Sequence, residues 1–171
     1  MSSPEEYLIG LGAAEHPHSG RSLFAHLRGT KAILQRWQYP EYVCLAGLFH
    51  SVYGTIAFPT ACAGIEQRAE IRQLIGAAAE RLVFLFCTTS RPRSLITCIQ
   101  SGELRMRSGA MVAIDMDTLR ALLAIEAANL LEQKTGRWLL KDLRAALDAD
   151  PGLLSLEARM ELERSAEGQT G

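Results

Sequence analysis

The chain has 171 residues, of which 48% are hydrophobic and 22% charged, a composition typical of one compact soluble domain. Its 18 basic and 19 acidic residues give a formal net charge of -1, which argues against binding of nucleic acid or of an anionic membrane through bulk charge. No apolar run approaches the roughly 18 residues that a membrane span requires, and the N-terminus is acidic where a signal peptide is basic. Together with four cysteines that form no C-x-x-C pair, these features predict a cytoplasmic protein.

Residues 1–20 contain two prolines and no long periodic run, so we expect an N-terminal arm laid over the domain. A helical pattern begins at residue 21. We predict one helical domain over residues 21–150, followed by a C-terminal helix and tail over residues 151–171.

The first two helices of that domain carry the most informative pattern. Apolar residues recur at steps of three and four over residues 22–37, which predicts an amphipathic helix with His26 on its inward face. The next helix opens at Pro40, is apolar on nearly every side, and should be buried as far as Tyr53. Because glycine costs about 1 kcal/mol of helix propensity relative to alanine, Gly47 indicates a close approach by the first helix.

The later helices are predicted from residues that cap helices or end them. Asp117 is the expected N-cap of the fifth helix, Gly136 its end, and Ser155 the cap of a tail helix. Residues 95–114 contain two Ser-Gly pairs and fit either a β-hairpin with Ser-Gly turns or irregular helix and loop, and we favour a small irregular or weakly paired excursion. The remaining pattern predicts helices over residues 65–75, 77–87, 118–134 and 138–147. The fold class is therefore all-α.

All four histidines lie in the first third of the chain. If the first two helices pack as an antiparallel hairpin, His26 and His50 meet across it, and the segment around His18 folds back toward them. Imidazoles that converge from two helices and a loop suit a transition metal such as zinc, iron or copper. The alternative is that these histidines are hydrogen-bonded core residues. We expect His16 to be merely exposed.

Further polar residues have a functional and a structural interpretation. Glu126, Asn129 and Gln133 share one face of the fifth helix. They form either a buried amide network or a site in which Glu126 is a base or metal ligand and Asn129 a ligand or substrate anchor. Tyr53 either binds an anion or an oxygen species or caps the packing, and Arg68, Arg91 and Arg93 bind a carboxylate or phosphate or pair with acids such as Glu70 and Glu80.

The segments HSGRSLFAHLRGTKAILQRW and VCLAGLFHSVYGT resemble the first helices of the HD-domain superfamily. In that all-helical fold an early histidine, a His-Asp pair and a late aspartate coordinate one or two metals. The resemblance puts His26 in the first place, His50-Ser51 in the second and Asn129 in the third. The phrases HLRGT, AGLFHSVYGT and EAANLLEQ are more similar still to an uncharacterised branch, a domain of unknown function with His-Ser in place of His-Asp. The resemblance covers about residues 19–133.

Because Ser51 and Asn129 are neutral where the superfamily has carboxylates, a dinuclear phosphohydrolase is not expected. We predict an HD-like helical bundle that acts on a small molecule by hydrolytic, lyase or oxidative chemistry. Its expected cofactor is iron, zinc or manganese, held by His18, His26 and His50. The catalytic candidates are Glu126, Tyr53 and Arg68, and the substrate-binding candidates are Ser51, Asn129 and Arg91.

The alternative is a non-catalytic HD-like module that has lost its metal and binds a ligand or a partner protein. In either case we expect no nucleic-acid and no membrane partner. The apolar second helix is compatible with a homodimer.

Overall fold

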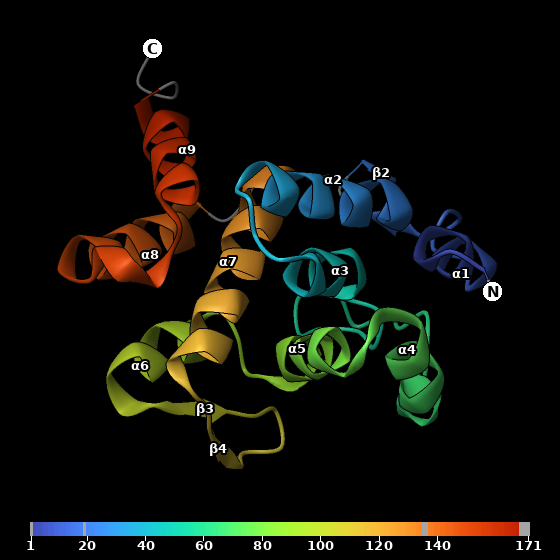
Figure 1. Ribbon diagram of the computed structural model, residues 1–171. Coiled ribbons are helices and arrows are strands. Elements are labelled where there is room, and N and C mark those ends of the chain that lie inside the picture. The colour runs from blue at the N-terminus through green and yellow to red at the C-terminus, as the bar shows by residue number, and fades with distance from the viewer. Residues whose placement is uncertain (1, 19, 135–136, 168–171) are drawn as a thin grey trace.

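The structure is a computed structural model that describes residues 2–18, 20–134 and 137–167. Over these residues the chain forms nine α-helices and two short antiparallel hairpins, which confirms the expected mainly helical fold (Figure 1). Its central helix is α7 (Met116–Gln133). On one side α7 packs against α2 (Leu23–Arg36) and α3 (Glu41–Phe49), and on the other against α8 (Arg137–Ala149) and α9 (Leu156–Glu167). The HD-like character of the fold stays a prediction.

The expected N-terminal arm contains regular structure. Helix α1 (Pro4–Gly10) begins at a capping box in which Ser3 accepts from the amide of Glu6 and the Glu6 carboxylate accepts from the amide of Ser3. Leu8 anchors it in the core. Strands β1 (Pro17–His18) and β2 (Arg21–Ser22), of two residues each, then form a hairpin that leads directly into α2.

Helix α2 has the predicted inward face. It begins at Ser22, whose hydroxyl accepts from the amide of Ala25. The expected stripe is buried in full: Leu23, His26, Leu27, Thr30, Ile33, Leu34 and Trp37. The close approach expected at Gly47 is also present, because a Cβ atom there would overlap the side chain of Leu34 on α2. The backbone of α3 at Gly47 therefore packs directly against the Leu34 side chain of α2. This close contact brings the histidines of the two helices together.

Helix α3 ends four residues earlier than expected, at Phe49, with His50 as its C-cap. The chain continues in tight turns, in which the amide of Val52 donates to the carbonyl of Phe49. The amide of Gly54 likewise donates to the carbonyl of Ser51, so turns with bonds between residues three apart replace the helix after Phe49 and leave His50 at its end. The carbonyl of Val52 accepts from the amides of Cys62 and Ala63, which holds the returning loop against these turns.

The next helices confirm the predicted pattern. A 3₁₀ turn (Ile65–Gln67) leads into α4 (Arg68–Ile75), and Gly76 separates α4 from α5 (Ala77–Thr88). Gly76 has a φ of 88°, a left-handed value that glycine adopts at little cost. Helix α5 packs against α3 and α4 and completes the core beside the α2–α3 pair, which carries His26 and His50.

The segment expected to be irregular is ordered. Helix α6 (Arg93–Ser101) is followed by the antiparallel strands β3 (Glu103–Arg105) and β4 (Met111–Ala113), so the expected small excursion is a short β-hairpin preceded by a helix. The two Ser-Gly pairs have different roles. Gly102 ends α6 in a left-handed conformation, whereas Gly109, with a φ of 89°, lies in the hairpin turn.

The N-cap of helix α7 lies two residues before the predicted one. Asp115, not Asp117, accepts from the amide of Thr118, at 2.7 Å. All residues from 121 to 130 are buried, as expected for a helix surrounded by others. The predicted end at Gly136 lies outside the described residues.

The C-terminal helices follow the prediction. Helix α8 covers the predicted residues 138–147 and is followed by a 3₁₀ turn (Pro151–Leu153), and the Ser155 hydroxyl caps α9 by accepting from the amide of Ala158. In the described part of the chain, no helix combines the length and the apolar composition needed to cross a bilayer.

Candidate functional site

Three of the four histidines meet, as their placement in the sequence predicts. The Nε2 atoms of His26 on α2 and His50 at the end of α3 lie 3.2 Å apart, with the rings nearly perpendicular. His18 on β1 packs its ring against that of His26, with centroids 4.4 Å apart. His26 and His50 are 1% and 2% exposed, and His18 is half-buried. His16, expected to be exposed, is half-buried and lies outside this cluster.

The other ring nitrogens face oxygen atoms. His26 Nδ1 is hydrogen-bonded to the carboxylate of Glu132, and His50 Nδ1 donates to the carbonyl oxygen of Gly47 at 2.7 Å. These acceptors assign the proton of each neutral ring to Nδ1 and leave both Nε2 atoms unprotonated. Burial lowers the pKa of His26 and lowers that of His50 well below its usual value, so both rings are neutral near pH 7.

Of the polar residues on α7, Asn129 and Gln133 form the amide network that was one of the two alternatives, whereas Glu126 pairs with Arg91. The Gln133 side-chain amide donates to Asn129 Oδ1 at 3.0 Å and lies 3.0 Å from His18 Nε2. Its nitrogen is also 3.4 Å from His26 Nε2. The face of α7 that carries Asn129 therefore borders the histidine cluster, and Gln133 connects it to the hairpin that bears His18.

Sequence reasoning missed Glu132, the acid that contacts the cluster directly. Its side chain is 6% exposed and bridges His26 and the guanidinium of Arg21. One signal was available: Gly29 lies three residues after His26 in HLRG, on the same face of the helix. A side chain at that position would overlap the Glu132 carboxylate, so Gly29 makes room for it.

Sequence reasoning also missed two phenylalanines. The ring of Phe58 packs edge-on against His18, with centroids 4.8 Å apart, and the ring of Phe86 packs edge-on against His50 at 5.3 Å. They border the cluster with apolar surface. The Phe58 loop and α5 carry no histidine pattern that would have pointed to them.

Glu126 and Arg91, expected to act in catalysis and substrate binding, are bonded to each other. Their side chains are only 5% and 8% exposed. The guanidinium lies over the ring of Phe86, 4.0 Å from its centroid. Among the described residues, no hydrogen bond joins either side chain to a histidine, but Phe86, which packs against the Arg91 guanidinium, also packs against His50.

Tyr53 and Arg68 belong to a second buried network. Arg68 binds the Glu80 carboxylate through two nitrogens, at 2.6 and 3.0 Å, and the Tyr53 hydroxyl donates to it at 3.2 Å. Burial, reinforced by the charge of Glu80, raises the pKa of Tyr53 far above its usual range. Cys87 lies between this network and the histidine cluster: its thiol donates to the backbone carbonyl of His50 at 3.1 Å and is hydrogen-bonded to the backbone of Tyr53.

Ser51 follows His50 directly and is buried. Its hydroxyl has no hydrogen-bond partner among the described residues. A buried hydroxyl without a partner costs free energy, so Ser51 stays a candidate for binding a further group.

The donor set fits one metal ion better than two. Two nitrogens bound to a tetrahedral zinc at about 2.0–2.1 Å lie about 3.3 Å apart, close to the separation of the His26 and His50 Nε2 atoms. Ser51 and Asn129 supply no carboxylate for a second metal. As the side chains stand, no group of three or more His, Cys, Asp or Glu among the described residues is arranged to hold a metal, because His18 is turned toward Gln133.

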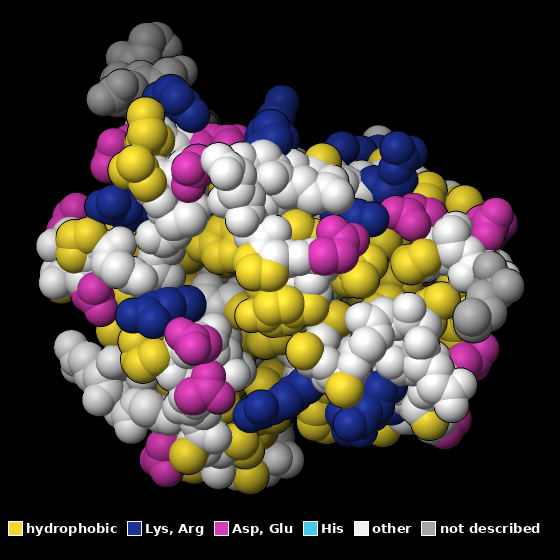
Figure 2. All heavy atoms as spheres, in the orientation of Figure 1, with side chains coloured by type: hydrophobic (Ala, Val, Ile, Leu, Met, Phe, Trp, Pro, Cys, Tyr) yellow, Lys and Arg dark blue, Asp and Glu magenta, His cyan; other side chains and the backbone are white. Residues whose placement is uncertain are grey.

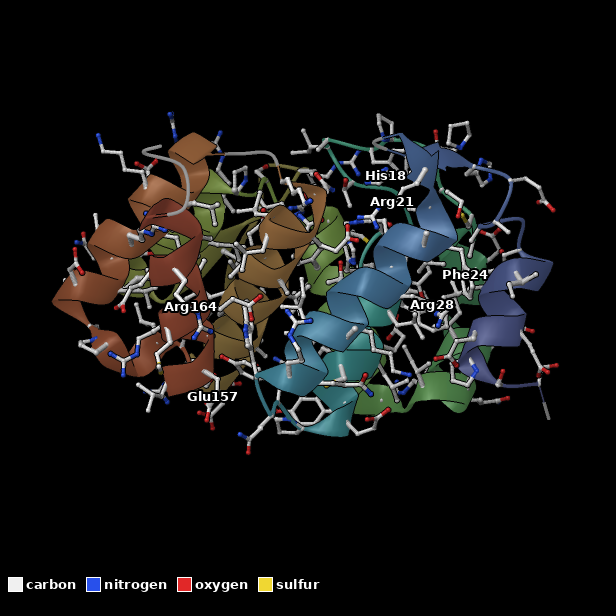
Figure 3. All side chains as sticks on the ribbon, turned by 90° about the horizontal axis from the view of Figure 1, so that it is seen from above. His18, Arg21, Phe24, Arg28, Glu157 and Arg164 are labelled. Carbon is white, nitrogen blue, oxygen red and sulfur yellow. The ribbon has the colours of Figure 1, made fainter. Side chains whose placement is uncertain are left out.

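The cluster lies near one edge of the fold. Figure 3 shows His18 and Arg21 side by side where the chain enters α2. On the face drawn in Figure 2 no histidine side chain is visible. Of the three clustered histidines, His18 is the most exposed, whereas His26 and His50 are buried.

A comparison with protein-family models matches residues 7–91 of the chain. No curated protein and no solved structure matches the chain. Nothing in the comparisons connects it with the HD-domain superfamily, so that resemblance stays a prediction. The matched region contains all three clustered histidines but ends before α7. Over residues 7–91, the chain is similar to the family described as "Domain of unknown function (DUF6817)".

Proposed function

We propose that this protein is an HD-like, metal-dependent enzyme that acts on a small molecule at a single metal ion bound by His26 and His50. The observation that carries the proposal is the 3.2 Å separation of two unprotonated Nε2 atoms in a buried site. Each ring has its proton on the opposite nitrogen, where an oxygen accepts it.

The proton count supports a cation between the rings. If His26 carried its proton on Nε2 to satisfy His50, its bare Nδ1 would face the Glu132 carboxylate. With the proton on Nδ1, two bare Nε2 atoms face each other, and with the proton on Nε2, a bare Nδ1 faces a carboxylate. Either tautomer of His26 therefore leaves two hydrogen-bond acceptors in contact. A positive ion between the Nε2 atoms removes this conflict, and because burial disfavours an imidazolium, a metal ion suits the site better than an extra proton.

His18 supplies the third ligand in this proposal. It is half-buried on a short hairpin, and its Nε2 is held by the Gln133 amide. Turning the His18 ring away from Gln133 would direct it to the metal and free the amide for a substrate. A metal held by three histidines would keep open coordination positions for water or substrate.

A zinc or iron ion in such a site supplies an activated water or a dioxygen-binding centre. The chain's own groups do the rest. The Asn129 and Gln133 amides orient a polar substrate, and Phe58 and Phe86 exclude water from the histidine rings. The identity of the bound metal decides whether the reaction is hydrolytic or lyase-type, or an oxidation.

One observation favours a second candidate, a ligand- or protein-binding module without metal. Both carboxylates nearest the cluster are engaged, Glu132 with His26 and Arg21, and Glu126 with Arg91. No free carboxylate is therefore left among the described residues at the cluster to act as a base. The cobalt titration described next decides between the two candidates.

The test is a titration of metal-stripped protein with Co²⁺, followed by visible absorption. We expect the d–d bands of a four- or five-coordinate cobalt–nitrogen centre, an end point near one equivalent, and loss of the bands in His50→Ala. His16→Ala, which changes a histidine outside the cluster, should keep them. Absence of the bands in the wild type, or their persistence in His50→Ala, would contradict the proposal and favour the metal-free module.

A further inference from the structure

Glu132 connects the buried histidine pair to the protein surface. One carboxylate oxygen is bonded to His26 Nδ1 and the other to the guanidinium of Arg21. Arg21 also donates to the backbone carbonyl of Glu132, at 3.1 Å. The carboxylate is almost fully buried, whereas the Arg21 side chain is 42% exposed. The three side chains thus form a chain of charge-assisted hydrogen bonds from β2 through α7 to α2.

The backbone of α2 is shaped to receive this carboxylate. Gly29 lies where a Cβ atom would overlap the Glu132 side chain. Glycine in a helix interior costs about 1 kcal/mol relative to alanine, and the space it leaves here is filled by a carboxylate bonded to His26. The hydrogen bond and the glycine are separate observations, and both place the same carboxylate at His26.

A carboxylate at Nδ1 has a definite effect on the imidazole. It holds the proton on Nδ1, fixes the orientation of the ring and makes Nε2 a stronger donor to a metal. His50 lacks this partner, because a neutral backbone carbonyl accepts its Nδ1 proton. The two facing histidines are therefore oriented by different groups, and only His26 depends on a residue that can be changed by mutation.

We propose that Glu132, anchored by Arg21, is the positioning residue for His26: it fixes the Nδ1-protonated tautomer and so directs Nε2 to the metal. This role rests on the proposed function. Glu132 does not itself touch the metal or the substrate. The competing interpretation is a purely structural salt bridge that joins α7 to the β1–β2 hairpin.

The first test compares Co²⁺ and Zn²⁺ affinities of the full-length wild type, Glu132→Gln and Glu132→Leu. Loss of such an outer partner weakens metal binding by about 10- to 100-fold. We expect the smaller loss in Glu132→Gln, since its amide oxygen still accepts from Nδ1, and the larger loss in Glu132→Leu. Glu161→Gln is the matched control: it removes the same charge from an acid that pairs with Arg36 on α2, and its affinity should be unchanged.

Gly29→Ala gives an independent route to the same result. The added methyl displaces the Glu132 carboxylate without altering its chemistry, so metal affinity should fall about as in Glu132→Gln. The control is Gly10→Ala, where a Cβ atom meets nothing within 4 Å. Unchanged affinity in Gly29→Ala and in both Glu132 variants, with only a loss of thermal stability, would establish the structural salt bridge and overturn the proposal.

The second test needs no metal. Nitrogen-15 NMR of metal-free protein labelled at histidine distinguishes the two tautomers by their ring-nitrogen shifts. We expect the Nδ1-protonated form for His26 in the wild type and a mixture in Glu132→Leu. An Nε2-protonated His26 in the wild type would overturn the inference. A wild type that shows the expected tautomer but binds no metal would instead refute the proposed function, while Glu132 would keep its role as the group that orients His26.

Discussion

His50 donates its Nδ1 proton to the carbonyl oxygen of Gly47, 2.7 Å away, in the last turn of α3. This bond is made by a neutral ring in a site that admits almost no water, since His50 is 2% exposed. The positive charge of Arg91, placed behind Phe86, further disfavours a second proton on His50. The histidine cluster is therefore built for neutral imidazoles, and its stability depends on pH.

We predict that the protein loses stability as the pH falls below about 6.5. The pKa values of His18, His26 and His50 are all lowered in the folded state, chiefly by burial, whereas the unfolded chain titrates near 6.5. Below that pH the unfolded state binds more protons, so the free energy of unfolding decreases, by up to about 1.4 kcal/mol per pH unit for each such histidine.

Urea unfolding of metal-free protein between pH 7.5 and 5 measures this slope. His50→Gln should make it shallower, whereas His16→Gln should leave it unchanged. Equal stability of the wild type at pH 7 and pH 5 would show that the clustered histidines accept protons freely and are not buried as described.

Gly47→Ala should destabilise the protein by about 1–3 kcal/mol, because the new methyl overlaps the fully buried side chain of Leu34. Gly10→Ala, at the end of α1, has open space around the new methyl and should be neutral within about 0.5 kcal/mol. Thermal unfolding of the two variants compares them directly. If Gly47→Ala were as stable as Gly10→Ala, α2 and α3 would not be in such close contact.

Arg91→Ala should cost about 3–5 kcal/mol, since it leaves the Glu126 carboxylate buried without its cation. Replacing both residues, as Arg91→Met with Glu126→Leu, should recover most of that loss because no charge is then left in the core. Chemical denaturation gives the three free energies. A double variant less stable than Arg91→Ala would show that the ion pair has a role beyond mutual neutralisation.

Tyr53→Phe separates the two buried networks. The hydroxyl donates to Glu80 and not to the histidines, so its loss should cost about 0.5–1.5 kcal/mol of stability and leave cobalt affinity unchanged. The catalytic role predicted for Tyr53 and Arg68 stays a prediction. A large loss of metal affinity in Tyr53→Phe would place the Glu80 network in the metal site after all.

The sequence predicts best what depends on local periodicity. The inward stripe of α2 and the Ser155 cap follow from helical spacing and capping chemistry, and both are present. The end of α3 was placed four residues too late, because the turns after Phe49 are held by a loop ten residues further along the chain, whose amides donate to the Val52 carbonyl. The hairpin after α6 pairs locally, but it also bonds to the segment after α5, where the amide of Ser90 donates to the carbonyl of Arg105.

The same limit applies to the site. That His26 and His50 meet follows from two amphipathic helices packed as a hairpin, which sequence spacing can indicate. Which acid lies behind His26 depends on the position of α7, more than a hundred residues further along the chain, and Glu132 was missed in favour of Glu126. The two acids are six residues apart on one helix, so they lie on different faces, and only the packed structure distinguishes them.

The most direct test of the account is the metal content of untagged protein, measured by elemental mass spectrometry beside the His26→Ala/His50→Ala double variant. We predict about one iron, zinc or manganese ion per wild-type chain and none in the variant. No metal in either protein, or equal metal in both, would contradict the central claim that the facing Nε2 atoms of His26 and His50 bind a metal ion.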